Sequence, residues 1–289
     1  MNAERLAAAR RKAWTLQHGY IAMLVLPCLV LCVFFVWPML MVLLRSFTDP
    51  TLNIDNYVEI FARPAYLRVL WNTLVVAFTV TVLCLLISYP VAAVIAGFKG
   101  GLLNLCFALI LIPFWTSTVI RTYAWMVLFQ RKGVLNGFLQ QVGLIDQPLE
   151  LMRNFIGVQI GMVHVLLPFM ILPLLSTLRG IDPVYMRAAG VLGANPVRAF
   201  LHVYLPLSMP GISAGVLLVF ITALGFFITP ALLGSERQMM IAMLIEQQVS
   251  VTVNWPLASA LSTLLLVVTI SIYLVYERLQ RRIAAGVLA

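Results

Sequence analysis

Long apolar runs alternate with short polar segments along the whole chain. Each run holds about 20 residues or more, the length that an α-helix needs to cross the hydrocarbon of a bilayer. A helix also bonds all of its own backbone groups, as lipid requires, whereas the alternation of a barrel strand is missing from these runs. The pattern predicts an all-α, polytopic membrane protein with six spans, at residues 20–44, 69–98, 102–120, 155–178, 203–234 and 255–276.

The composition narrows the class of protein further. Hydrophobic residues make up 62% of the chain and charged residues only 10%, against about 25% charged residues in soluble domains. These values exclude a soluble enzyme and a disordered protein. They also make the net charge of +9 a sign of membrane orientation rather than of nucleic-acid binding.

The positive charges gather on one side of the predicted spans. The two ends of the chain and the second and fourth loops carry eleven Lys and Arg against three acids, and the other side carries eight against seven. Because positive loops stay in the cytoplasm, both termini are expected there. The chain then divides into a cytoplasmic N-terminal segment at 1–19, a transmembrane domain at 20–276 and a cytoplasmic C-terminal tail at 277–289. The N-terminal segment fits either a short helix on the lipid surface of the inner leaflet or a frayed basic tail.

Few residues in the predicted spans carry chemistry. The four cysteines all lie inside spans. A buried cysteine usually packs as a small apolar side chain, which is favoured here over a redox or metal role. His164 is the one ionisable residue well inside a span, and it either bonds a backbone carbonyl or lines a pathway. The chain has no GxxxxGK[ST] loop for ATP phosphates. We therefore expect no catalytic site, no metal site and no ATP hydrolysis by this chain.

The cytoplasmic loop at 179–206 carries two helix-start signals. Asp182 precedes Pro183, and Asn195 precedes Pro196, and each pair combines a capping side chain with proline at the first helical position. The first helix is expected to end near Gly193. The loop thus predicts a helix-turn-helix just below the membrane, whose small residues would let a partner approach the backbone, although an ordinary interfacial loop is the alternative.

This loop resembles the EAA loop of permease subunits of ATP-binding-cassette importers. The family pattern is E-A-A, three residues, G, nine residues, then I-x-L-P. Arg187, Ala188 and Ala189 occupy the E-A-A positions here, Gly193 follows at the right spacing, and Val203, Leu205 and Pro206 close the pattern. Arg187 replaces the family's glutamate, which removes whatever ionic contact that acid makes with the ATPase.

The resemblance extends over most of the chain. The matching residues include Asn72 and Thr73, Tyr89 and Pro90, 115–125, 133–144, 229–234 and 240–245. The last two segments are similar to the spermidine/putrescine branch of the family, whose relatives also import opines and other small organic solutes. The resemblance implies a type I importer permease (MetI-like) fold in a bacterial inner membrane.

The resemblance also implies the partners and their cofactors. These are an ATPase dimer that binds ATP and Mg²⁺, a second homologous permease and a periplasmic substrate-binding protein. The ATPase-coupling residues are then Asp182, Pro183, Arg187, Ala188, Ala189, Gly193 and Pro206.

The solute contacts are less well defined by the sequence. A polyamine needs carboxylates and aromatic faces, and His164, Glu236, Glu246 and Trp255 are the candidates for the pathway. Solvated loop residues and an interfacial tryptophan are the alternative for the last three. An ion-driven transporter or a cofactor-holding membrane subunit is disfavoured, because the spans lack buried carboxylates and paired ligands.

Overall fold

The structure, a computed structural model, describes residues 23–48 and 52–287, and every regular element within these ranges is a helix. The predicted N-terminal segment at 1–19 lies outside the described residues. The first helix contains a π-helical turn at Cys32–Val36 and continues as α2 (Trp37–Thr48).

Five helices are long and apolar enough to cross a membrane. They are Met23–Thr48, α4 (Pro64–Ala96), α8 (Phe155–Gly180), the helix at Pro196–Leu224 that includes α10 (Pro196–Ala199) and α11 (Leu205–Leu224), and α14, which spans at Trp255–Arg278 and continues to Val287. A sixth span is reached when α5 (Gly100–Trp115) and the helices after it count as one broken span. The predicted number of spans is therefore confirmed with one of them broken.

The third predicted span is not one straight helix. It was expected over 102–120, but α5 ends at Trp115 and the chain bends by 94° before α6 (Thr118–Phe129). Pro113 cannot donate a backbone bond, and Thr116 takes an extended conformation while its hydroxyl donates to the Pro113 carbonyl at 3.1 Å. This local bonding stabilises the break.

The fifth predicted span is also shorter than expected. The apolar run reaches residue 234, but α11 ends at Leu224 with Gly225 as its C-cap, and α12 (Ile228–Leu233) packs instead against α6 and α8. Hydropathy does not detect this break because both pieces are equally apolar. The remaining short helices are α3 (Asp55–Ala62), α7 (Val134–Gln141), α9 (Pro183–Val191) and α13 (Ile241–Ser250).

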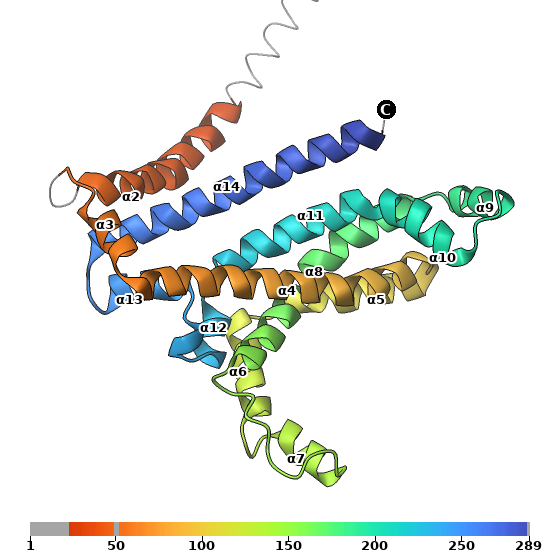
Figure 1. Cartoon of the computed structure of the whole chain (residues 1–289), viewed down its shortest axis with the longest axis horizontal. Coiled ribbons are helices and arrows are strands. Elements are labelled where there is room, and N and C mark those ends of the chain that lie inside the picture. The colour runs from red at the N-terminus through yellow and green to blue at the C-terminus, as the bar shows by residue number, and fades with distance from the viewer. Residues whose placement is uncertain (1–22, 49–51, 288–289) are drawn as a thin grey trace, which may run out of the picture.

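The long helices form a bundle with α8 at its centre. The most extensive contacts of α8 are with α11 and α4, and α14 packs on α2 and α13 (Figure 1). Gly215 lets α11 approach α8 closely, because a Cβ there would lie 2.6 Å from the Met170 sulfur. Small residues at such crossings are typical of membrane bundles.

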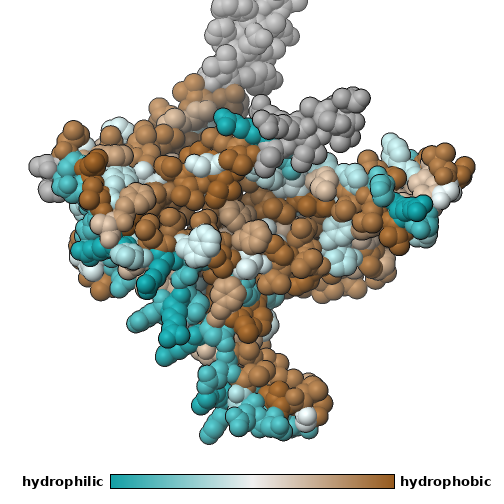
Figure 2. Space-filling view, in the orientation of Figure 1, coloured by the Kyte–Doolittle hydropathy of each residue, from teal (hydrophilic) through white to brown (hydrophobic). Residues whose placement is uncertain are grey.

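Short helices lie at both ends of the bundle, and an arm leaves it sideways. One end carries α9 and α10, and the opposite end carries α3 and α13, while α6 and α7 form an arm that leaves the bundle sideways (Figure 1). Figure 2 shows apolar surface over the bundle, with hydrophilic residues near α9 and along one side of the arm. The surface of the bundle is thus largely apolar, as lipid contact requires.

Candidate functional site

The loop after α8 forms the predicted pair of capped helices. The Asp182 carboxylate accepts the Val184 N–H at 2.8 Å at the start of α9, and the Asn195 side chain accepts the Arg198 N–H at 2.8 Å at the start of α10. Each cap satisfies one of the N–H groups that the first turn leaves unbonded. The predicted helix-turn-helix geometry is confirmed.

Gly193 makes the turn between the two helices. Its φ is +84°, in the left-handed region where residues with a Cβ are strained. The next N–H, of Ala194, returns to the Ala189 carbonyl at 3.0 Å and closes the end of α9. Ala189 is buried, whereas Ala188 and Arg187 are exposed. Arg187 makes no salt bridge with the described side chains.

An aromatic cluster connects this loop to two spans. Phe200, just after α10, packs edge-on against Tyr89 of α4 at 6.0 Å and stacks on Tyr204 at 5.9 Å. The Tyr89 hydroxyl also forms a hydrogen bond of 3.0 Å with the buried Ser208 of α11. Pro206 is the second residue of α11 and directly follows the π-helical turn at Phe200–Tyr204, inside the continuous helix from Pro196 to Leu224. The cluster therefore links the segment after α10 to both α4 and α11.

The outer face of the loop is apolar and accessible. Val191 and Leu192 are each 87% exposed, and Val184 and Tyr185 are about half exposed. Exposed apolar side chains grouped in this way are typical of a surface that docks a partner. The loop thus combines an exposed apolar surface, two capped helices and a connection to the bundle.

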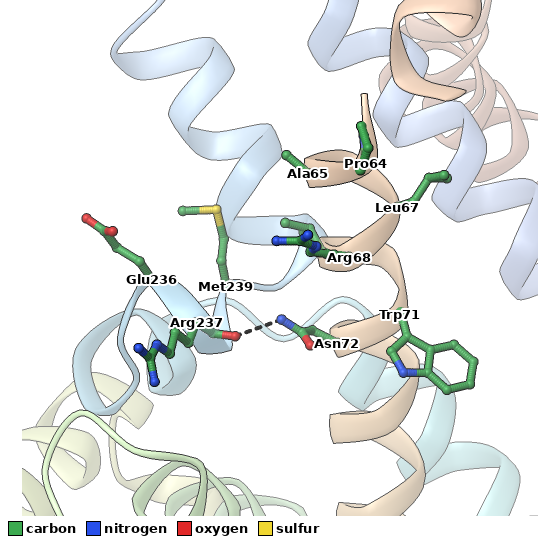
Figure 3. A pocket seen from close by; sticks show the side chains of 10 residues that line it. Pro64, Ala65, Leu67, Arg68, Trp71, Asn72, Glu236, Arg237 and Met239 are labelled. Atoms are coloured by element: carbon green, nitrogen blue, oxygen red, sulfur yellow. Dashed lines mark hydrogen bonds between the residues drawn. The ribbon is translucent and has the colours of Figure 1, made fainter. Parts of the chain in front are cut away.

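At the opposite end, Asn72 and Thr73 tie α4 to the segment between α12 and α13. The Asn72 amide donates to the Arg237 carbonyl at 2.7 Å (Figure 3). The Thr73 hydroxyl accepts the Ile241 N–H at 2.8 Å. These two residues are among those that the family resemblance includes, and they are the point where α4 is fastened to this end.

A cavity of about 910 Å³ lies beside this contact. Arg68, Glu236 and Arg237 line it, so its charged residues are two cations and one anion, and Figure 3 shows the Glu236 carboxylate pointing away from α4. Glu246 and Trp255 are exposed and do not line this cavity with Glu236. The structure thus does not assemble the three candidate residues into one site for an ammonium group.

The sequence left two alternatives for His164, a bond to a backbone carbonyl or a place on a pathway, and the structure gives it a side-chain partner. Its Nδ1 accepts a hydrogen bond of 3.0 Å from the Trp125 indole, and both residues line a mostly apolar cavity of about 570 Å³ with Gln159. The sequence did not identify Trp125 as the partner of His164, because the two residues are 39 positions apart and Trp125 lies beyond the break in the third span. Among the described residues, no three His, Cys, Asp or Glu side chains group as metal ligands.

Comparison with known proteins gives consistent relatives. The chain is 39% identical over 227 residues to the spermidine/putrescine transport system permease protein PotB of Haemophilus influenzae, covering 78% of this chain and 79% of that one. Identity to PotB of Escherichia coli K12 is 37% over 236 residues, with 82% and 86% coverage.

A solved structure also resembles the chain. It is a bacterial alginate ABC transporter in complex with an alginate-pentasaccharide-bound periplasmic protein, and the match has a TM-score of 0.75 at 21% identity, covering 96% of this chain and 98% of that one. No protein-family profile matches the chain.

Proposed function

The chain belongs to the family of permease subunits of ATP-binding-cassette importers, and from this premise we propose that it forms part of the translocation pathway for a polyamine such as spermidine or putrescine. The PotB relatives, at 37% and 39% identity, support the solute class. The proposal locates the chain in a bacterial inner membrane with both termini in the cytoplasm, which the charge asymmetry of the loops supports.

The proposed coupling element is the helix pair at 179–206. ATP and Mg²⁺ bind to a separate ATPase dimer, which docks on the apolar face around Val191 and Leu192. The capping residue Asp182 and the turn at Gly193 keep α9 rigid, and Arg187 lies on the docking side. The observation that carries this assignment is the connection from Phe200 through Tyr89 to Ser208, because it joins the docking face to α4 and α11.

The proposed cycle follows from that connection. Closure of the ATPase dimer pushes α9, and the aromatic cluster passes the movement to α4 and α11. These helices rock relative to a second, homologous permease subunit, and the pathway between the subunits opens alternately to each side. A periplasmic binding protein delivers the solute to the end that carries α3 and α13.

The test is uptake of radiolabelled spermidine and putrescine by cells that lack this chain and then regain it, with the neighbouring subunits present. Loss and recovery of uptake support both the transport role and the solute class. Unchanged polyamine uptake would refute the solute class, and an opine or another small organic solute would then be measured in the same strains.

The coupling proposal is tested separately by purification. An ATPase subunit should co-purify with the wild-type chain and be released when Val191 and Leu192 are both replaced by Asp. The matched control replaces exposed Val251 and Val253, near the opposite end, by Asp. Equal ATPase retention in both double variants would overturn the assignment.

A further inference from the structure

A cavity with a mixed polar and apolar lining lies at the break between α5 and α6. Its volume is about 360 Å³, and its lining combines hydroxyl side chains at the break, including Ser117 and Thr118, with the rings of Phe114, Phe169 and Phe226. The same lining contains one cation, Arg121, from the first turn of α6. The cavity therefore has a single charged group in otherwise neutral surroundings.

Arg121 is poorly satisfied by its own chain. Its Nη2 donates to the Thr118 hydroxyl at 3.3 Å, but its Nε is buried without a hydrogen-bond partner among the described residues. No described acidic side chain forms a salt bridge with it. A guanidinium has five N–H donors and stays charged, so this arrangement leaves most of its bonding capacity to something else.

The break lies within the membrane-spanning part of the fold. α5 has 16 residues and rises about 24 Å at 1.5 Å per residue, which is less than the roughly 30 Å of the hydrocarbon. The cavity wall on the other side includes Pro168, in the middle of α8. A charged side chain at this depth is costly unless it is paired, and such residues mark functional sites.

We propose that this cavity binds a carboxylate through Arg121. One fixed cation balances the single negative charge of a carboxylate, whereas a phosphate group carries up to about two. The planar guanidinium matches the two carboxylate oxygens in a bidentate pair. The positive end of the α6 dipole at the break adds to the attraction, and the phenylalanine rings accommodate the apolar stem of the group that bears the carboxylate.

Two sources can supply that carboxylate. One is an acidic side chain of the second permease subunit, and the other is the carboxyl group of a small solute. An ammonium group is repelled by the same charge, so the site is distinct from any polyamine contact. The inference requires assembly into an importer but does not rest on the polyamine assignment.

The experiment compares R121Q and R121K with R131Q in the complete importer, reconstituted in lipid nanodiscs. Arg131 is an exposed residue that pairs with Glu150 at the far end of the same arm, so R131Q removes one positive charge without touching the cavity. The melting temperature of each complex is measured with sodium butyrate and with butyramide, a neutral probe of the same shape. In parallel, each membrane-embedded acid of the second permease is changed to its amide.

The expected result is coupling between Arg121 and a carboxylate. If the carboxylate belongs to the second permease, R121Q lowers the melting temperature by about 5 °C or more, R121K by less, and R131Q by almost nothing. A partner carboxylate is identified when one acid-to-amide change lowers the melting temperature equally and does not add to R121Q. A solute carboxylate is identified when butyrate, but not butyramide, stabilises wild type and fails to stabilise R121Q.

The proposal is overturned if butyrate and butyramide act alike on wild type while every acid-to-amide change adds fully to R121Q. If R121Q does not assemble, the same additivity and butyrate tests are made on R121K. That variant keeps the positive charge but loses the planar guanidinium that forms the bidentate pair, so these tests still decide whether the proposal holds.

Discussion

Replacement of Gly193 by alanine should uncouple ATP hydrolysis from transport while leaving the bundle assembled. Gly193 has φ of +84°, and a Cβ there would meet nothing within 4 Å. The substitution therefore adds backbone strain without a steric clash, at a cost of about 1–2 kcal/mol. That cost lowers the population of the native turn by roughly tenfold relative to its alternatives, and the Ala194–Ala189 bond that closes α9 is lost with it.

Gly143 provides a matched control at the end of α7. Its φ is +72°, its Cβ position is equally open, and the following N–H closes the helix in the same way, from Leu144 to Leu139 at 3.0 Å. G143A should therefore suffer similar strain in the arm, away from the coupling loop. G193N should be milder than G193A, because asparagine tolerates the left-handed conformation.

The assay is the number of ATP molecules hydrolysed per solute imported in proteoliposomes that contain the complete importer. We expect this ratio to rise several-fold for G193A, less for G193N, and not at all for G143A. An unchanged ratio for G193A, or an equal rise for G143A, would refute the reasoning that the rigid turn after α9 transmits the movement.

Two further predictions concern packing and capping. Gly211→Ala would put a Cβ 2.7 Å from the Thr177 Cβ, about 1 Å inside an optimal carbon contact, so it should destabilise the α8–α11 contact by about 1–3 kcal/mol. The melting temperature of the complex should fall accordingly. Gly137→Ala has open space around its Cβ and should leave the melting temperature unchanged or slightly higher, because alanine favours a helix interior over glycine. Equal values for both variants would count against this packing. Asp182→Ala should weaken the start of α9 by about 1 kcal/mol and speed hydrogen exchange across 183–191, while Asp182→Asn keeps the acceptor and should exchange like wild type. Exchange in the alanine variant that matches wild type would show that the cap is dispensable.

Much of the fold follows from local signals in the sequence. A helix that spans lipid is a property of about 20 consecutive residues, and a cap involves residues two or three positions apart, as for Asp182 and Val184. These signals predict the long helices and the helix pair at 179–206. Hydropathy measures the transfer of side chains into lipid and carries no information on the direction of the helix axis. It therefore does not reveal that the apolar run after Leu102 turns by 94° at Trp115.

The candidate sites also differ in how far the sequence predicts them. The coupling residues from Arg187 to Pro206 are recognised by their spacing along the chain, which needs no structure. The three candidates Glu236, Glu246 and Trp255 are close in sequence, but they lie on three different helices, η3 (Glu236–Gln238), α13 and α14, and of the three only Glu236 lines the cavity beside Asn72. Proximity along the chain was a poor guide where the backbone changes direction.

The sequence by itself determined the membrane class, the number of spans and the two capped helices, because each depends on neighbouring residues. Only the tertiary structure decided which side chains meet. Tyr89 and Ser208 are 119 positions apart, and Asn72 and Arg237 are 165 apart. Such pairs depend on the order, tilt and rotation of packed helices, which arise from the fit of whole surfaces in the bundle rather than from any single segment.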